Sequence, residues 1–162
     1  MATSIAPSDP FTGVLSGSAL PVTGASGVKA EMSVMLNVKD VHRSLSFYKS
    51  LGFESRWETE GEDGRLNYAG VGIGDAVIAL GRIPKDVKSM AKDYADWVST
   101  PLGAGVMVTV ELDEVEALYK TAQKAKVTID SPLSERLYGT AFVVNDPDGY
   151  VVRFLRPTGV YA

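Results

Sequence analysis

The strongest constraint on the fold of this chain is an internal repeat. The alternating segment Val34-Met35-Leu36-Asn37-Val38 returns about 72 residues later as Val106-Met107-Val108-Thr109-Val110. A helical pattern follows each segment, and Tyr48-Lys49 in the first pattern returns as Tyr119-Lys120 in the second. Because the order of the elements also repeats, the sequence predicts two copies of one structural module.

The first copy is predicted to be a βαβββ module. Apolar and polar residues alternate over 34–38 as they do in a half-buried strand. A helix follows, with Asp40 as its N-cap and Gly52 as the left-handed residue that ends it. Three further strands are predicted near 53–59, 65–72 and 75–81.

The second copy is predicted to repeat this order. Its first strand covers 106–110, and Asp113 begins its helix. The turn Asp146-Pro147-Asp148-Gly149 separates the last two strands. The three strands after the helix are predicted near 126–129, 139–145 and 150–156. Two such modules place the chain in the α+β class.

The chain is predicted to hold one domain preceded by an irregular arm. Residues 1–28 show no periodicity and form the arm, which is either a free tail or a segment lying on a partner subunit. Residues 29–162 form the domain, with modules at about 31–81 and 104–157 and a linker at 82–103. In the linker, Met90, Tyr94 and Trp97 follow helical spacing, as core filling or as a lid.

Composition removes several classes of function. The chain has no Cys, which excludes disulfides and thiolate chemistry and is compatible with a cytoplasmic protein. Its net charge is −4 and its cations are dispersed, so nucleic acid is not an expected partner. No apolar run is long enough for a membrane helix, so no membrane partner is expected.

Several segments, taken together and in order, resemble a known superfamily. They are Leu36-x-Val38-x-Asp40, Ser44-Leu45-x-Phe47-Tyr48, Leu51-Gly52-Phe53, and Tyr138-Gly139 followed by Asp146-Pro147-Asp148-Gly149-Tyr150. The set spans roughly residues 31–157 and is similar to the glyoxalase, bleomycin-resistance and dioxygenase superfamily of vicinal oxygen chelate proteins. The resemblance implies a curved eight-stranded mixed sheet around a cleft, with the helices outside.

The resemblance also implies four metal-ligand positions, which metal-dependent members fill with His or Glu. Carried over one by one, they are Ser33, Ala79, Gly105 and Arg153. These residues offer no set of oxygen or imidazole donors, and a guanidinium repels a cation. We therefore expect no metal and no cofactor, as in the metal-free bleomycin-resistance branch. His42, the only histidine, lies off the apolar face of its helix and is predicted to be exposed.

Strand alternation within the implied cleft predicts which side chains contact a ligand. The predicted ligand-binding residues form a mostly apolar surface with few polar groups: Arg153, Met35, Met107, Glu111, Trp57, Trp97, Tyr68, Ser33 and Asn37. Phe142 is a further candidate for an aromatic wall, although core packing is the commoner role for it and for the other aromatic residues named here.

The sequence leaves the chemical roles of Arg153 and Glu111 undecided. Arg153 is either an anchor for an anionic ligand or the partner of Glu111 or Glu58 in an internal ion pair. Glu111 becomes a candidate general base only if burial raises its pKa. No catalytic residue is otherwise indicated.

Three classes of function remain open at this stage. The first is a protein that sequesters a small organic molecule or antibiotic, as metal-free bleomycin-resistance proteins do in a groove between two subunits, which implies a homodimer. The second is a metal-independent lyase, isomerase or cyclase using the same cleft. The third is a structural or regulatory protein that kept the fold alone. The missing ligands favour the binding protein over an enzyme.

Overall fold

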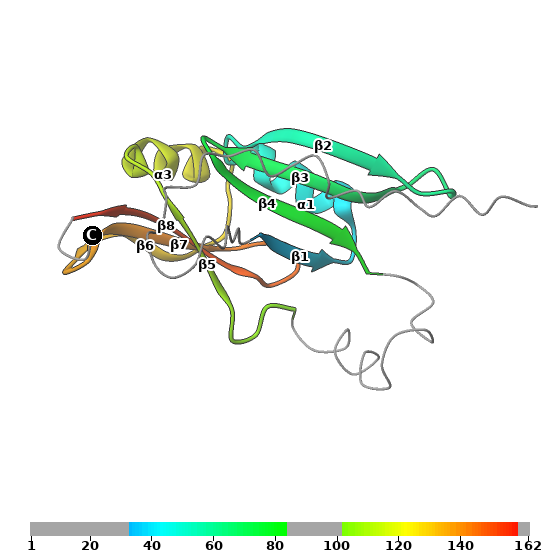
Figure 1. Ribbon diagram of the computed structural model, residues 1–162. Helices are drawn as coiled ribbons and strands as arrows, with labels where there is room; N and C mark the ends of the chain where they lie inside the picture. The colour runs from blue at the N-terminus through cyan, green and yellow to red at the C-terminus, as the bar shows by residue number, and fades with distance from the viewer. Residues whose placement is uncertain (1–32, 84–101, 159–162) are drawn as a thin grey trace, which may run out of the picture. The chain divides into compact units, whose positions relative to one another are not determined.

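Each repeat folds into a four-stranded sheet with one helix packed against it (Figure 1). The computed structural model describes residues 33–83 and 102–158. The first module consists of β1 (Val34–Val38), α1 (Val41–Ser50), β2 (Glu54–Glu60), β3 (Leu66–Ile73) and β4 (Ala76–Arg82). The second consists of β5 (Met107–Glu111), α3 (Val115–Lys124), β6 (Ile129–Arg136), β7 (Gly139–Asn145) and β8 (Val151–Pro157).

The two sheets have the same strand order. In the first sheet the order is β1-β4-β3-β2, and in the second it is β5-β8-β7-β6. The first strand of each module runs parallel to its last strand, and the remaining pairs are antiparallel. The prediction of two βαβββ modules with eight strands in an α+β fold is confirmed, and each module forms its own mixed sheet.

The helix boundaries follow local capping. The Asp40 carboxylate accepts a hydrogen bond from the Arg43 backbone N–H at 3.0 Å, so Asp40 is the N-cap of α1 as predicted. Gly52 follows α1 at φ +91°, a conformation that favours glycine. The helix α3 begins at Val115 after Glu114, which makes no side-chain capping bond, so the predicted start at Asp113 was too early.

The strand predicted near 126–129 was misplaced. The structure puts β6 at Ile129–Arg136, with only Ile129 in common. This strand contains Pro132 and a register irregularity between Ser131 and Ser134. Because β6 lies at the edge of its sheet, it tolerates a residue that donates no ladder hydrogen bond, and its polar sequence hides the strand pattern.

One apolar core joins both modules. Leu36 and Leu80 from the first sheet and Val152 from the second are buried in the same cluster. The rings of Phe53 and Phe154 meet edge to face across the two modules, with centroids 6.1 Å apart. The apolar residues of the alternating pattern in β1, Leu36 and Val38, therefore lie in the core, as expected for a half-buried strand.

Phe142 belongs to this core, so of its two expected roles, core residue or aromatic wall of the cleft, the structure supports the first. Its side chain is fully buried, and its ring packs against those of Tyr119 and Phe154. Val108, Val110 and Phe154 occupy the same face of the second sheet, because β8 pairs with β7 and β5 in matching register. Phe142 thus points toward the helix side of its sheet.

Several predictions fall outside the described residues. They concern the arm at 1–28 and the linker helix with Met90, Tyr94 and Trp97. The division into arm, domain, modules and linker accordingly remains a prediction. Within the parts of the chain that are described, no helix has the length and apolar character needed to cross a membrane.

Candidate functional site

The open face of the first sheet is the face opposite the helix-facing core residues. Trp57, Gly70, Ala79 and Met35 stand side by side on β2, β3, β4 and β1. Their neighbours along β1 and β4, Leu36 and the residues paired with it, point to the buried side. Met35 keeps 44% of its surface exposed, so this face presents accessible apolar atoms.

Three glycines leave parts of the backbone on this open face without side chains. Gly70, Gly72 and Gly81 all lie on it, where larger side chains would stand above the strands. A Cβ at Gly70 would overlap the indole of Trp57, so the indole packs directly over the β3 backbone. A Cβ at Gly81 would lie 3.2 Å from the Met35 sulfur. The aromatic and thioether side chains therefore lie across the sheet.

Arg153 lies on the open face of the second sheet, opposite Thr109 of β5. Its Nε–H donates to the Thr109 hydroxyl oxygen at 3.1 Å. Its guanidinium carbon lies 5.3 Å from the centre of the Tyr138 ring, which is within the range of a cation–π contact. Tyr138 was not predicted as a site residue. It lies in the turn between β6 and β7, where the alternation of a strand does not define the direction of a side chain.

The internal ion pair considered for Arg153 is absent from the described residues. Glu58 pairs in register with the buried Ala69, so it lies on the helix side of the first sheet and not on the open face. There it accepts from the Ser55 hydroxyl at 2.7 Å and lies 3.6 Å from Lys49 Nζ. These contacts lower the pKa of Glu58, with the Ser55 hydrogen bond as the largest cause. Glu111 is exposed and lies on the same open face as Arg153 without pairing with it.

The remaining predicted site residues fall into two groups. Tyr68 and Asn37 are half-buried and share the open face of the first sheet with Met35 and Trp57. Met107 is 51% exposed on the open face of the second sheet. Ser33 is exposed immediately before β1. Trp97 lies outside the described residues.

The carried-over metal positions do not fit a divalent cation. Ala79 is buried in β4 and offers a methyl group, and Arg153 offers only hydrogen-bond donors. Gly105 is exposed at φ +82° and has no side chain. The single histidine, His42, is exposed on α1, as predicted. In residues 33–83 and 102–158, no three His, Cys, Asp or Glu side chains come together.

Sequence reasoning missed a polar junction between the modules. Asp148, whose side chain is fully buried, accepts hydrogen bonds from Arg43 Nη2 at 2.9 Å and from the buried Ser44 hydroxyl at 3.2 Å. The Tyr48 hydroxyl donates to Asp146 at 3.3 Å. Ser44 and Tyr48 belong to one of the segments that carry the family resemblance, and Asp146 and Asp148 belong to another. The polar residues of these two segments were the signal from which the contact could have been predicted.

Burial changes the titration of this junction. Burial raises the pKa of the Tyr48 hydroxyl well above its ordinary value, and the neighbouring Asp146 carboxylate adds to the effect. Burial also raises the pKa of Asp146, although backbone N–H groups of Tyr150 and Asp148 donate to it at 2.8 and 2.9 Å. Tyr48 and Asp146 are therefore a structural hydrogen-bonded pair inside the protein.

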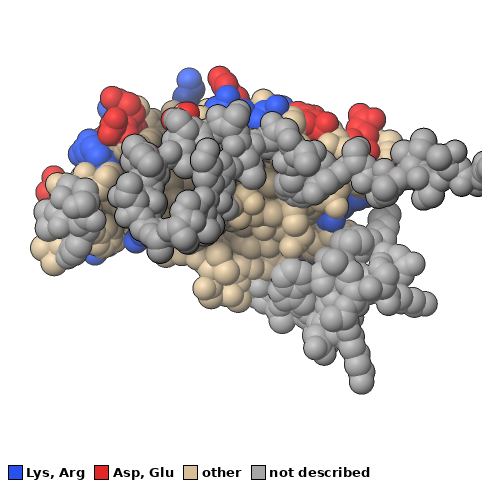
Figure 2. Space-filling view, in the orientation of Figure 1, with Lys and Arg blue, Asp and Glu red and all other residues tan. Residues whose placement is uncertain are grey.

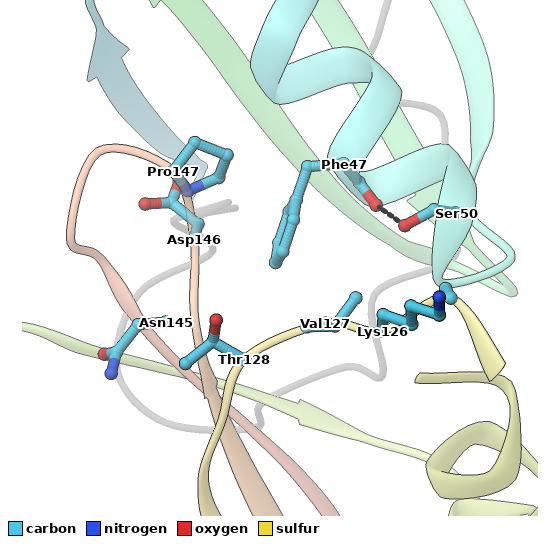
Figure 3. A pocket seen from close by; sticks show the side chains of 9 residues that line it. Phe47, Ser50, Lys126, Val127, Thr128, Asn145, Asp146 and Pro147 are labelled. Carbon is cyan, nitrogen blue, oxygen red and sulfur yellow. Dashed lines mark hydrogen bonds between the residues drawn. The ribbon is translucent and has the colours of Figure 1, made fainter. Parts of the chain in front are cut away.

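A surface cavity of about 370 Å³ lies beside this junction (Figure 3). Phe47 projects into it from α1, and Val127 and Pro147 form other parts of its wall (Figure 3). Two of its polar side chains have partners within the protein: Ser50 donates to the Phe47 carbonyl and Asn145 to Asp130. The cavity contains none of the predicted ligand-binding residues, and we interpret it as a packing seam between the modules.

The match to a family model agrees with this arrangement. Residues 32–154 match the model of the Glyoxalase/Bleomycin resistance protein/Dioxygenase superfamily. This chain belongs to that superfamily. The match covers both modules and the motifs that form the polar junction. A search of proteins with curated functions finds no significant match.

Several solved structures share the fold. UcmS2 is 23% identical, with a TM-score of 0.64 over 79% of this chain and 98% of that one. TnmS3, an antibiotic binding protein from Streptomyces sp. CB03234, is 19% identical, with a TM-score of 0.60 over 83% and 100%. The bleomycin-binding protein of Streptomyces verticillus, in complex with copper(II)-bleomycin, is 27% identical, with a TM-score of 0.53 over 80% and 98%.

Proposed function

We propose that this protein binds a small, largely apolar organic molecule without a metal ion. The observation that carries the proposal is the open face of the first sheet, where Met35 and Val77 are exposed beside the half-buried Trp57. Exposed apolar side chains that gather on one face of a sheet mark a contact surface for a ligand or partner. Polarizable Met and aromatic side chains suit an organic ligand of varied shape.

The charge distribution supports an organic ligand. Most of the acidic and basic side chains visible in Figure 2 lie along its upper edge, and uncharged surface is visible below them. The predicted ligand-binding residues would form this site together, with Arg153 as its polar anchor. An antibiotic is one class of such ligand, because two of the compared structures are antibiotic-binding and bleomycin-binding proteins.

The exposure of Glu111 weighs against a metal-independent enzyme. A general base near neutral pH needs burial or a neighbouring charge that raises its pKa. Glu111 is exposed at the end of β5. Among the described residues, the groups whose pKa is raised, Tyr48 and Asp146, lie inside the junction. The binding protein is therefore the function that this geometry supports best.

Tryptophan fluorescence tests the proposal directly. A panel of aromatic natural products, antibiotics included, is titrated into the full chain while emission is recorded. We expect saturable quenching by at least one member of the panel, weakened at least tenfold by Met35→Glu, which places a charge on the exposed apolar face. His42→Glu, on the exposed side of α1, is the matched control and should leave binding unchanged. Equal weakening by both variants, or no saturable binding at all, would overturn the proposal.

A further inference from the structure

We infer that Arg153 recognises a planar carboxylate on the ligand, and that Thr109 and Tyr138 hold its guanidinium in the required orientation. The inference deepens the proposed function and rests on it. It specifies the charged group of the ligand and assigns positioning roles to Thr109 and Tyr138, neither of which is among the predicted ligand-binding residues.

Thr109 fixes the inner edge of the guanidinium. Arg153 and Thr109 are directly opposite each other on the parallel strands β8 and β5, and the Nε–Oγ1 distance is 3.1 Å. This bond uses one of the five N–H donors that an arginine carries. The four donors on Nη1 and Nη2 remain, and they form the planar fork that matches the two oxygens of a carboxylate.

Tyr138 holds one face of the same group. Its ring centre is 5.3 Å from the guanidinium carbon, and 38% of its surface is exposed. Gly139 brings the chain close to β8, since a Cβ there would overlap the Arg156 carbonyl oxygen. A glycine at this position, at φ +143°, therefore allows Tyr138 to reach Arg153.

Arg153 lacks the counter-charge that the other half-buried arginines of the described residues, Arg82 and Arg156, have; the exposed Arg65 and Arg136 also lack one. Four other arginines in the described part of the chain lie within 4.0 Å of a carboxylate: Arg43 with Asp148, Arg56 with Glu54, Arg82 with Asp63 and Arg156 with Glu116. No acidic group within those same residues pairs with Arg153, although Arg153 is half-buried. A partly desolvated guanidinium without an anion favours a ligand that supplies one.

The surroundings favour a singly charged anion. Glu111 lies on the same face of β5, two positions from Thr109, and its negative charge opposes a second charge on the ligand. Met107 lies two positions from Thr109 in the other direction and is 51% exposed, so an apolar body has a surface to contact. An aromatic or aliphatic monocarboxylate fits this combination better than a phosphate dianion.

Three matched probes test the inference by titration calorimetry on the full chain: naphthalene carboxylate, its neutral methyl ester, and naphthyl phosphate. We expect the carboxylate to bind about tenfold to a hundredfold more tightly than the ester, the range for a charge-assisted hydrogen-bonded contact. The phosphate should bind more weakly than the carboxylate. Arg153→Ala should remove the preference for carboxylate over ester and leave binding of the ester unchanged.

The positioning roles have their own variants. Thr109→Val and Tyr138→Leu should each reduce the carboxylate preference by roughly threefold or more. Thr109→Ser and Tyr138→Phe, which keep the hydroxyl and the ring, should restore it. Arg156→Ala is the matched control on β8, because Arg156 pairs with Glu116 of α3. It should leave the preference intact.

The outcomes separate the inference from the proposed function. If the ester binds as tightly as the carboxylate, the carboxylate inference is wrong and an apolar binding site remains. If the phosphate binds most tightly, Arg153 recognises a phosphate on the ligand and not a carboxylate, and the inference is wrong. If Thr109→Ser and Tyr138→Phe lose as much preference as Thr109→Val and Tyr138→Leu, the positioning roles are wrong. If the unmodified chain binds none of the probes, both the inference and the proposed function are wrong.

Discussion

Ser44 on α1 donates a hydrogen bond to Asp148, 104 positions further along the chain, and both side chains are buried. The Lys39 backbone N–H and Arg43 Nη2 donate to the other oxygen of the same carboxylate at 3.3 and 2.9 Å. Three donors satisfy a carboxylate that would otherwise be costly to bury. The turn between β7 and β8 thereby holds the helix of the first module.

Removal of this carboxylate should destabilise the protein. Asp148→Ala leaves the buried Ser44 hydroxyl and the Lys39 N–H without their acceptor, so we expect the free energy of unfolding to fall by about 2–4 kcal/mol. Urea unfolding followed by circular dichroism measures the loss. Asp63→Ala removes an exposed partner of Arg82 and should leave the midpoint almost unchanged. Similar midpoints for the two variants would show that the junction does not stabilise the fold.

The raised pKa of Asp146 predicts a pH dependence with a defined sign. A group whose pKa is raised by folding stabilises the folded state while it is protonated in both states, and this stabilisation is lost as the pH rises through the folded-state pKa. We compare the free energy of unfolding of the unmodified chain with that of Asp146→Asn. The difference, unmodified chain minus variant, should fall as the pH rises above 3.8, the ordinary pKa of an aspartate. The expected change is about 1.4 kcal/mol for each unit by which the pKa is raised. Urea titrations at several pH values give this difference, and a rise with pH would contradict the assignment.

Gly70 should be intolerant of any side chain. A methyl group there overlaps the Trp57 indole, so Gly70→Ala must displace the indole. We expect a shift in tryptophan emission and a stability loss of about 1–3 kcal/mol, typical of overpacking. Gly81→Ala, whose methyl group meets the flexible Met35 side chain at 3.2 Å, is the control and should change both readouts less. Unchanged emission in Gly70→Ala would show that the Trp57 indole does not pack over Gly70.

The donor set at the carried-over positions predicts weak or no metal binding. Elemental analysis after incubation with Zn, Ni, Mn or Fe salts and dialysis should find well below one ion per chain, since Ala79 and Arg153 supply no metal donors. Chelator treatment should leave the melting temperature unchanged. One ion per chain that survives dialysis would contradict this prediction.

Homodimer formation is expected from exposed apolar side chains. Leu137 at the β6–β7 turn is 88% exposed and Val106 before β5 is 51% exposed, which favours burial against a second copy. Light scattering at tens of micromolar should give twice the chain mass, and Leu137→Asp should shift the equilibrium toward monomer. A monomer at that concentration for the unmodified chain would disprove this prediction.

The local pattern of the sequence determined most of the secondary structure. Period-two alternation located β1 and β5 to within a residue, and the strands near 53–59, 65–72 and 75–81 lie within one residue of β2, β3 and β4. β6 was misplaced because an edge strand with Pro132 carries no such pattern. The role of Phe142 was left open between core and ligand wall because aromatic character alone does not define the face of a strand.

The sequence by itself determined the two repeated modules, the core-facing side of β1 and β5 and the absence of metal donors at Ala79 and Arg153. These properties depend on side-chain chemistry and on periods of two or 3.6 residues, which are local. Only the tertiary structure decided that Arg153 contacts Thr109 and Tyr138, that Glu58 lies on the helix side, and that Asp148 binds Ser44. Such contacts depend on strand register, turn geometry and the docking of one module on the other, which bring together residues that are distant along the chain.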